Sequence, residues 1–122
     1  MKITQESKSR VLFVNNDPNI SEPITLILKD AGYVTIIAHS IRTGMKLVNE
    51  ERFDMFLIDW DFADGTGLDL CRSIRLVDEQ TPILFYLAER HAFTLKKAMQ
   101  AGAQGCIPRP VDIHSSHKAL SN

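Results

Sequence analysis

Short, nearly continuous apolar segments alternate along the chain with segments whose apolar residues are three or four positions apart. Continuous apolar runs of this length are typical of strands that are buried on both faces, whereas the wider spacing predicts amphipathic helices. The predicted strands cover residues 10–14, 33–38, 53–58, 82–87 and 105–108. This alternation predicts a parallel sheet with helices packed on both of its faces.

Local signals set the ends of the predicted helices. The first helix is expected to begin near Ser21, so that Pro23 lies in its first turn, and to end at Gly32. Ser40 is a candidate N-cap for the second helix. The buried face of the third is expected to consist of Leu70, Cys71, Ile74 and Val77. We therefore expect an α/β fold of the flavodoxin-like, doubly wound type, with strand order 2-1-3-4-5.

Later helices are predicted over residues 93–101 and 112–120. Residues 1–9 read as a polar lead-in and residues 10–122 as one domain, because 122 residues leave little room for a second. The net charge of −1 offers no electrostatic case for a nucleic-acid or membrane surface. The absence of an apolar leader or membrane-length run makes a cytoplasmic location the expectation.

Polar residues follow the apolar runs at one edge of the predicted sheet. Sheets of this type bind ligands outside the carboxyl ends of their strands, where the strand order reverses. The residues at that edge are Asn15, Asn16 and Asp17 after the first strand, Asp59 to Asp61 after the third, residues 87–89 after the fourth, and Arg109 and Pro110 after the fifth. Asp59 could be a nucleophile, a metal ligand, or a residue that merely ends its strand.

Several segments resemble, in order and spacing, the receiver domain of two-component response regulators, from about Arg10 to Leu120. They are VLFVNNDPN, FLIDWDFADGTGLDLCRSIR, TPILFYLAE and AMQAGAQGCIPRPVD. The resemblance implies that Asp59 occupies the phospho-acceptor position and that the main-chain carbonyl of Asp61 occupies a magnesium-ligand position. Pro110 stands where the family usually has a cis proline.

Most other functional positions depart from the family pattern. The acidic pair of the family falls on Asn15 and Asn16, and its hydroxyl residue falls on Leu87. The switch aromatic is Cys106, and the lysine at the end of the fifth strand is Arg109. The resemblance therefore implies a degenerate receiver in which the usual switch residues are missing.

These departures predict a weak magnesium site. Phosphoryl transfer to a carboxylate needs charge neutralisation, and Mg²⁺, which supplies it, prefers carboxylate ligands. Asp59, Asp61 and Asn16 remain as ligands of such a site, and each missing charge is worth up to roughly 4 kcal/mol at contact distance. Asp17 could substitute as a ligand or could cap a helix. A direct Asp59–Arg109 pair could satisfy the acceptor without metal.

The resulting expectation is a signalling domain, not an enzyme, that acts largely through protein contacts. Its partner would be a sensor histidine kinase or another signalling protein. A conventional phosphorylatable switch is the alternative, since Asp59 persists. The sequence leaves open the kinase, the output, the oligomeric state and whether the chain is part of a longer protein.

Other readings of the same residues fit less well. Asp59 and Asp61 resemble the DxD of aspartate-nucleophile phosphatases, but those enzymes carry it on the first strand. A calcium loop fails on spacing, and a flavin site would need a phosphate cradle that NNDPN does not provide. Trp60 is either a partner contact or a packing residue. His114 and His117 share a helical spacing, but Asp112 is their only nearby acidic partner and no Cys is close, which favours solvent exposure.

Overall fold

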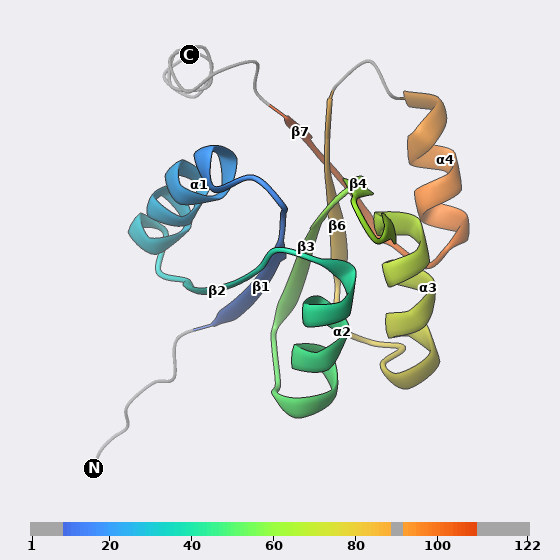
Figure 1. Ribbon diagram of the computed structural model, residues 1–122, viewed down its shortest axis with the longest axis horizontal. Coiled ribbons are helices and arrows are strands. Elements are labelled where there is room, and N and C mark those ends of the chain that lie inside the picture. The colour runs from blue at the N-terminus through green and yellow to red at the C-terminus, as the bar shows by residue number, and fades with distance from the viewer. Residues whose placement is uncertain (1–8, 89–91, 110–122) are drawn as a thin grey trace.

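A five-stranded parallel sheet forms the centre of the computed structural model, which describes residues 9–88 and 92–109. Its strands are β1 (Arg10–Val14), β2 (Val34–Ala38), β3 (Met55–Asp59), β6 (Ile83–Ala88) and β7 (Gly105–Arg109). Their order is β2-β1-β3-β6-β7 (Figure 1). Because β6 and β7 are the fourth and fifth strands of this sheet, the predicted order 2-1-3-4-5 is confirmed.

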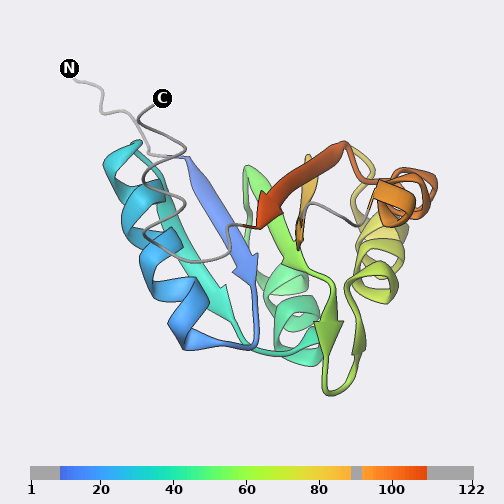
Figure 2. The ribbon, with the colours of Figure 1, turned by 90° about the horizontal axis from the view of Figure 1, so that it is seen from above.

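Helices cover both faces of the sheet (Figure 2). They are α1 (Pro18–Asp30), α2 (Ile41–Glu50), α3 (Gly67–Val77) and α4 (Ala92–Gln100). On the α1 side, Val11, Phe13, Leu57 and Tyr86 form a buried cluster. The larger cluster on the opposite side takes the alternate strand residues, such as Leu12 and Ile58, and packs them against α2, α3 and α4. Both sides of each central strand are therefore apolar, which explains the continuous apolar runs.

The first helix begins earlier than predicted. Asp17 is its N-cap, with a carboxylate that accepts a hydrogen bond from the Asn19 N–H at 2.9 Å, and Pro18 is its first residue. The prediction that the helix begins near Ser21 was wrong, and Pro23 lies inside the helix. Proline at this position removes the N–H that would bind the Asn19 carbonyl. Asn19 is exposed, so water can replace that bond.

Burial is confirmed for three of the four residues that were predicted to form the core face of the third helix. Leu70, Cys71 and Ile74 are each 0% exposed, whereas Val77 is 59% exposed, so its predicted burial was wrong. The helix ends at Val77, and the Asp78 carboxylate then accepts hydrogen bonds that form the turn into β6. The last two side chains of the helix, Leu76 and Val77, face solvent.

The guanidinium of Arg75 connects three segments beside this turn. It donates to the carbonyl oxygens of Gly102 and Asp78, each at 2.9 Å, and to Gln104 Oε1 at 3.0 Å. Gln104 Oε1 also accepts the backbone N–H of Ile83 at 2.7 Å. Arg75 therefore joins the end of α3 to the segment between α4 and β7.

A small antiparallel hairpin that the sequence reading did not predict follows β3. Its strands are β4 (Asp61–Phe62) and β5 (Gly65–Thr66), with Ala63 and Asp64 at the turn. Aspartate followed by glycine is a frequent hairpin signal, and Gly65 has φ +145°, which favours glycine. The hairpin connects the end of β3 to the start of α3. None of the helices described is long and apolar enough to cross a membrane.

Candidate functional site

The candidate site lies at the carboxyl end of the sheet, where β1 and β3 end side by side. Val14 and Ile58 are partners in the parallel ladder, and Asn15 and Asp59 are the next residues on the two strands. Asn15 is 0% exposed and Asp59 is 6% exposed. The structure thus brings together two of the residues that the sequence places at this edge.

Both carboxylate oxygens of Asp59 accept hydrogen bonds. Asn15 Nδ2 donates to Oδ2 at 2.9 Å, and the backbone N–H of Trp60 donates to Oδ1 at 2.7 Å. A carboxylate this deeply buried needs such donors, because burial removes the water that would otherwise solvate its charge. Both of these donors, the Asn15 amide and the Trp60 N–H, are neutral groups.

The amide of Asn15 is fixed in the orientation that directs its NH₂ group at Asp59. Its Oδ1 accepts the backbone N–H of Asp17 at 2.8 Å, and an N–H donor can face only the oxygen of an amide. The main chain of Asn15 is held as well, because its N–H donates to the Ala38 carbonyl at 2.9 Å and its carbonyl lies 3.0 Å from His39 Nδ1. Asn15 therefore presents a hydrogen-bond donor to the Asp59 carboxylate.

The next two residues, Asn16 and Asp17, connect β1 to α1. Asn16 is exposed on the loop after β1. Asp17 directs its carboxylate at the first turn of α1, where it accepts the Asn19 N–H. Of the two roles considered for Asp17, the structure therefore shows helix capping.

The hairpin geometry leaves the main-chain carbonyl of Asp61 out of its ladder. The carbonyl of Trp60 accepts the Gly67 N–H at 2.6 Å, so Trp60 and Gly67 form a hydrogen-bonded pair. Such pairs alternate in an antiparallel ladder, so the next hydrogen-bonded pair is Phe62–Gly65 and the intervening Asp61–Thr66 pair is not bonded. The Asp61 carbonyl is thus available as an oxygen ligand, while its side chain is exposed.

The remaining predicted positions lie at the ends of β6 and β7. The ladder pairs Leu87 with Pro108, and Arg109 is the last residue of β7, so the backbone places Leu87 and Arg109 at the same edge as Asp59. Cys106 lies opposite Phe85, is half-buried, and has a thiol whose pKa is raised by burial. Pro110 and the predicted last helix, with His114 and His117, lie outside the described residues.

Trp60 packs against its own domain. Its ring lies 5.2 Å from the ring of Phe85, at an interplanar angle of 57°, and it contacts the larger core cluster together with Phe62. Of the two roles considered for Trp60, the structure therefore shows packing. The chain contains no other tryptophan, so its fluorescence reports on the position next to Asp59.

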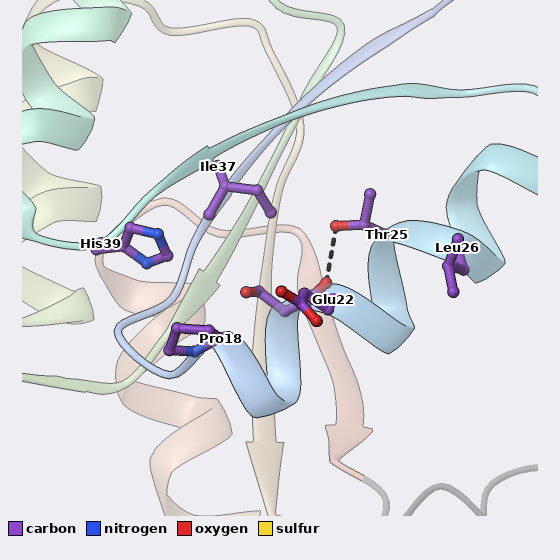
Figure 3. Close-up of a pocket in the computed structure, with 7 residues that line it drawn as sticks. Pro18, Glu22, Thr25, Leu26, Ile37 and His39 are labelled. Atoms are coloured by element: carbon purple, nitrogen blue, oxygen red, sulfur yellow. Dashed lines mark hydrogen bonds between the residues drawn. The ribbon is translucent and has the colours of Figure 1, made fainter.

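A groove of about 450 Å³ lies between α1 and β2, close to the site (Figure 3). The groove is lined from α1 by Pro18, Ser21, Glu22, Thr25 and Leu26, and on the other side by Ile37 of β2 and by His39, which follows that strand. The ring of His39, which contacts the Asn15 carbonyl, forms one end of this groove.

Comparison with known proteins identifies the family. The family model for the response regulator receiver domain matches residues 11–121. The chain belongs to the response regulator receiver family.

The receiver is 32% identical over 107 residues to the response regulator protein PilR of Pseudomonas aeruginosa, a match that covers 88% of this chain and 24% of PilR. It is 27% identical to the DNA-binding response regulator MtrA of Mycolicibacterium smegmatis, over 84% of this chain and 45% of MtrA. Among solved structures, the chemotaxis response regulator CheY4 of Vibrio cholerae is 25% identical with a TM-score of 0.81, covering 94% of this chain and 98% of that one. The chain thus spans less than half the length of PilR and of MtrA. In contrast, its fold matches 98% of the CheY4 chain.

Receiver domains of this family bind Mg²⁺ in general. No group of three or more His, Cys, Asp or Glu side chains within the described ranges could hold a metal ion. The amide of Asn15 directs its nitrogen, not its oxygen, toward Asp59. Asp59 and the carbonyl of Asp61 remain as candidate oxygen ligands, with Asn16 nearby, and together they carry one negative charge.

Two residues that hold this site were missed in the sequence reading. Gly67 lies against the end of β3, where an added Cβ would overlap the Asp59 carbonyl oxygen and lie 2.8 Å from Phe85 Cε1. The Asp64 carboxylate accepts the backbone N–H groups of Ile41 and Arg42, each at 3.1 Å. The Asp64-Gly65 dipeptide could have revealed the hairpin, whereas the position of Gly67 depends on packing that no local pattern reports.

Proposed function

We propose that this two-component receiver has a weakened magnesium-dependent phosphorylation switch and acts largely through protein contacts. One observation carries the proposal: the Asn15 amide donates directly to the acceptor carboxylate. In a receiver that uses Mg²⁺, an acid at this position repels the acceptor until the metal arrives. Here the same contact is attractive without metal, so the metal-free state is already stable.

The chemistry of phosphoryl transfer explains why this arrangement weakens the switch. An Asp59 oxygen must attack phosphorus, forming a P–O bond, while the bond from phosphorus to the donor's imidazole or carboxylate breaks and that group leaves. All the oxygens involved are negative, so the reaction depends on positive charge at the site. The donors from Asn15 and Trp60 are neutral, and the one that bonds the attacking Asp59 oxygen must be displaced or redirected when that oxygen becomes esterified.

The two positions that relay phosphorylation in the family also support the proposal. Leu87 has no hydroxyl to donate to a phosphoryl oxygen, and Cys106 has no ring to reorient. A ligand shifts a conformational equilibrium only by its difference in affinity for the two states. Without these side chains, phosphorylation of Asp59 lacks the usual means of producing such a difference.

The partner would be a sensor histidine kinase or another signalling protein. The two-component relatives are response regulators, and MtrA is described as DNA-binding, but the match covers 45% of MtrA. A net charge of −1 gives this receiver no electrostatic preference for nucleic acid, so any DNA binding would belong to another domain.

Intact mass after incubation with Mg²⁺ and acetyl phosphate tests the proposal. We expect little or no gain of one phosphoryl mass in the wild type, and none in Asp59→Ala. The Asn15→Asp, Asn16→Asp double variant is the matched control, because it restores both acids; it should gain the phosphoryl mass at a much higher rate. Full phosphorylation of the wild type at the rate of the double variant would refute the proposal.

A conventional phosphorylatable receiver is the second candidate. It is supported by the Asp61 carbonyl, which makes no hydrogen bond in the hairpin ladder and which the family resemblance assigns as a magnesium ligand. Measurement of Mg²⁺ affinity from Trp60 fluorescence distinguishes the two candidates. A dissociation constant that falls strongly in the double variant supports the weakened switch, and equal constants support the conventional one.

A further inference from the structure

The β4–β5 hairpin joins Asp59, at the end of β3, to the start of α2. One end of the hairpin begins directly after Asp59, and the other carries the Asp64 carboxylate that contacts α2. In Figure 1 the hairpin extends from the end of β3 above α3. The hairpin and the contacts at its two ends therefore form one continuous connection between Asp59 and α2.

At the acceptor end, Trp60 makes three kinds of contact. Its N–H donates to Asp59 Oδ1 at 2.7 Å, its carbonyl accepts the Gly67 N–H at 2.6 Å, and its ring packs 5.2 Å from that of Phe85. The bond to Gly67 begins the hairpin ladder that continues at Phe62 and Gly65. A displacement of the Trp60 backbone would thus move the whole hairpin.

At the far end, the hairpin holds the first turn of α2 by both hydrogen bonds and packing. Asp64 accepts the N–H groups of Ile41 and Arg42, two of the donors that a helix N-terminus leaves without intrahelical partners. Gly65 approaches so closely that an added Cβ would lie 2.9 Å from Ile41 Cδ1. Ser40 caps the next donor, Thr43, so Asp64 completes a cap that α2 cannot make alone.

We infer that the hairpin couples Asp59 to the first turn of α2, so that the surface formed by residues 61–66 and 41–43 reports the state of the acceptor. This inference rests on the proposed function, because it names the surface through which a receiver lacking the usual relay side chains would contact its partners. When the Trp60 N–H no longer has the Asp59 carboxylate as its hydrogen-bond acceptor, the first pair of the hairpin ladder, Trp60 and Gly67, is released. Release of the ladder then loosens the Asp64 cap on α2. Allosteric coupling of this kind is reciprocal, so loosening the cap also changes the surroundings of Trp60.

Hydrogen exchange in the metal-free, unphosphorylated protein tests the coupling. In Asp59→Ala we expect the amides of Ile41 and Arg42 to exchange faster by roughly five-fold or more, the factor that corresponds to about 1 kcal/mol. The Thr81 amide, which donates to the Asp78 carboxylate at the far end of α3, is the internal reference and should change no more than the global stability requires. Unchanged relative exchange at Ile41 and Arg42 would overturn the inference.

Two further variants keep the test decisive. Asp54→Ala removes a carboxylate that accepts the Arg10 N–H at 2.7 Å at the opposite end of β3, and it should not selectively affect α2. Asp64→Ala should shift the emission of Trp60 and increase its quenching by acrylamide, even if Asp59→Ala does not fold. An unchanged Trp60 signal in Asp64→Ala would contradict the coupling. Because no experiment here uses Mg²⁺ or a phosphodonor, failure of the coupling is distinguishable from failure of the proposed phosphorylation behaviour.

Discussion

Replacement of Asn15 by aspartate tests the physical basis of the proposed weakening of the switch. The wild-type contact joins Asn15 Nδ2 to Asp59 Oδ2 at 2.9 Å, and both side chains are buried. Asn15→Asp exchanges this hydrogen bond for two carboxylates whose charges are about 4 Å apart, which repel by about 4 kcal/mol at an effective dielectric constant of about 20. We therefore expect the metal-free variant to lose up to about 4 kcal/mol of unfolding free energy.

Magnesium should restore most of that loss. A cation between the two carboxylates replaces repulsion by attraction, and ligand binding to the native state adds about 2.7 kcal/mol when the free ion is at about 100 times its dissociation constant. The assay is urea denaturation followed by Trp60 fluorescence, with EDTA and with saturating Mg²⁺. The difference between the two midpoints measures the linkage between metal binding and folding.

Asn15→Ala is the matched control for this experiment. It removes the donor to Asp59 without adding charge, so we expect a loss of about 1–3 kcal/mol that Mg²⁺ does not restore. The reasoning would be refuted if Asn15→Asp had the same midpoint in EDTA and in Mg²⁺. It would also be refuted if the wild type gained as much from Mg²⁺ as the variant.

Three other predictions concern the framework of the site. Gly67→Ala should lower the unfolding free energy by about 1–3 kcal/mol, because its methyl group would overlap the Asp59 carbonyl; an unchanged urea midpoint would contradict this. Arg75→Ala should cost about 1–3 kcal/mol in the same assay, and Arg75→Lys should recover little, because an ammonium cannot reproduce the three contacts of the guanidinium; full recovery by lysine would refute this account. The free energy of unfolding should fall as the solution is acidified below about pH 4. Hydrogen bonds from the backbone N–H groups of Arg42 and Ile41 hold the pKa of Asp64 below its ordinary value of 3.8. A carboxylate whose pKa is lowered in the native state stabilises that state only while it is ionised. Asp64→Asn should flatten this dependence in thermal melts across the acid range, and an identical pH profile would count against it.

Much of the fold could be predicted because its signals are local. The strand over residues 10–14 is apolar throughout, and its predicted bounds match β1. The predicted Ser40 cap is confirmed because a short hydroxyl side chain bonds the Thr43 N–H three residues later. The start of α1 was wrong because the proline rule was applied to Pro23, whereas the cap at Asp17 and an exposed Asn19 carbonyl allow the helix to continue through it.

The site was harder to predict, because its chemistry depends on the direction in which side chains point. The sequence places Asn15 and Asp59 at one edge, and parallel pairing of β1 with β3 brings them together. That the amide nitrogen of Asn15 faces Asp59 follows from the Asp17 N–H, which claims the amide oxygen. The spacing of apolar residues along the sequence does not indicate this orientation. It depends on the turn after β1, in which the Asp17 N–H needs a hydrogen-bond acceptor.

The same orientation makes the effect of Asn15 larger than the loss of one charge. An asparagine whose oxygen faced the acceptor could still help to ligate a cation, directly or through water. Here the Asp17 N–H and the Asp59 carboxylate each favour the observed orientation, so reversing the amide would break both bonds and place oxygen against oxygen and N–H against N–H. Metal binding would therefore have to displace a satisfied donor as well as compensate for the missing carboxylate.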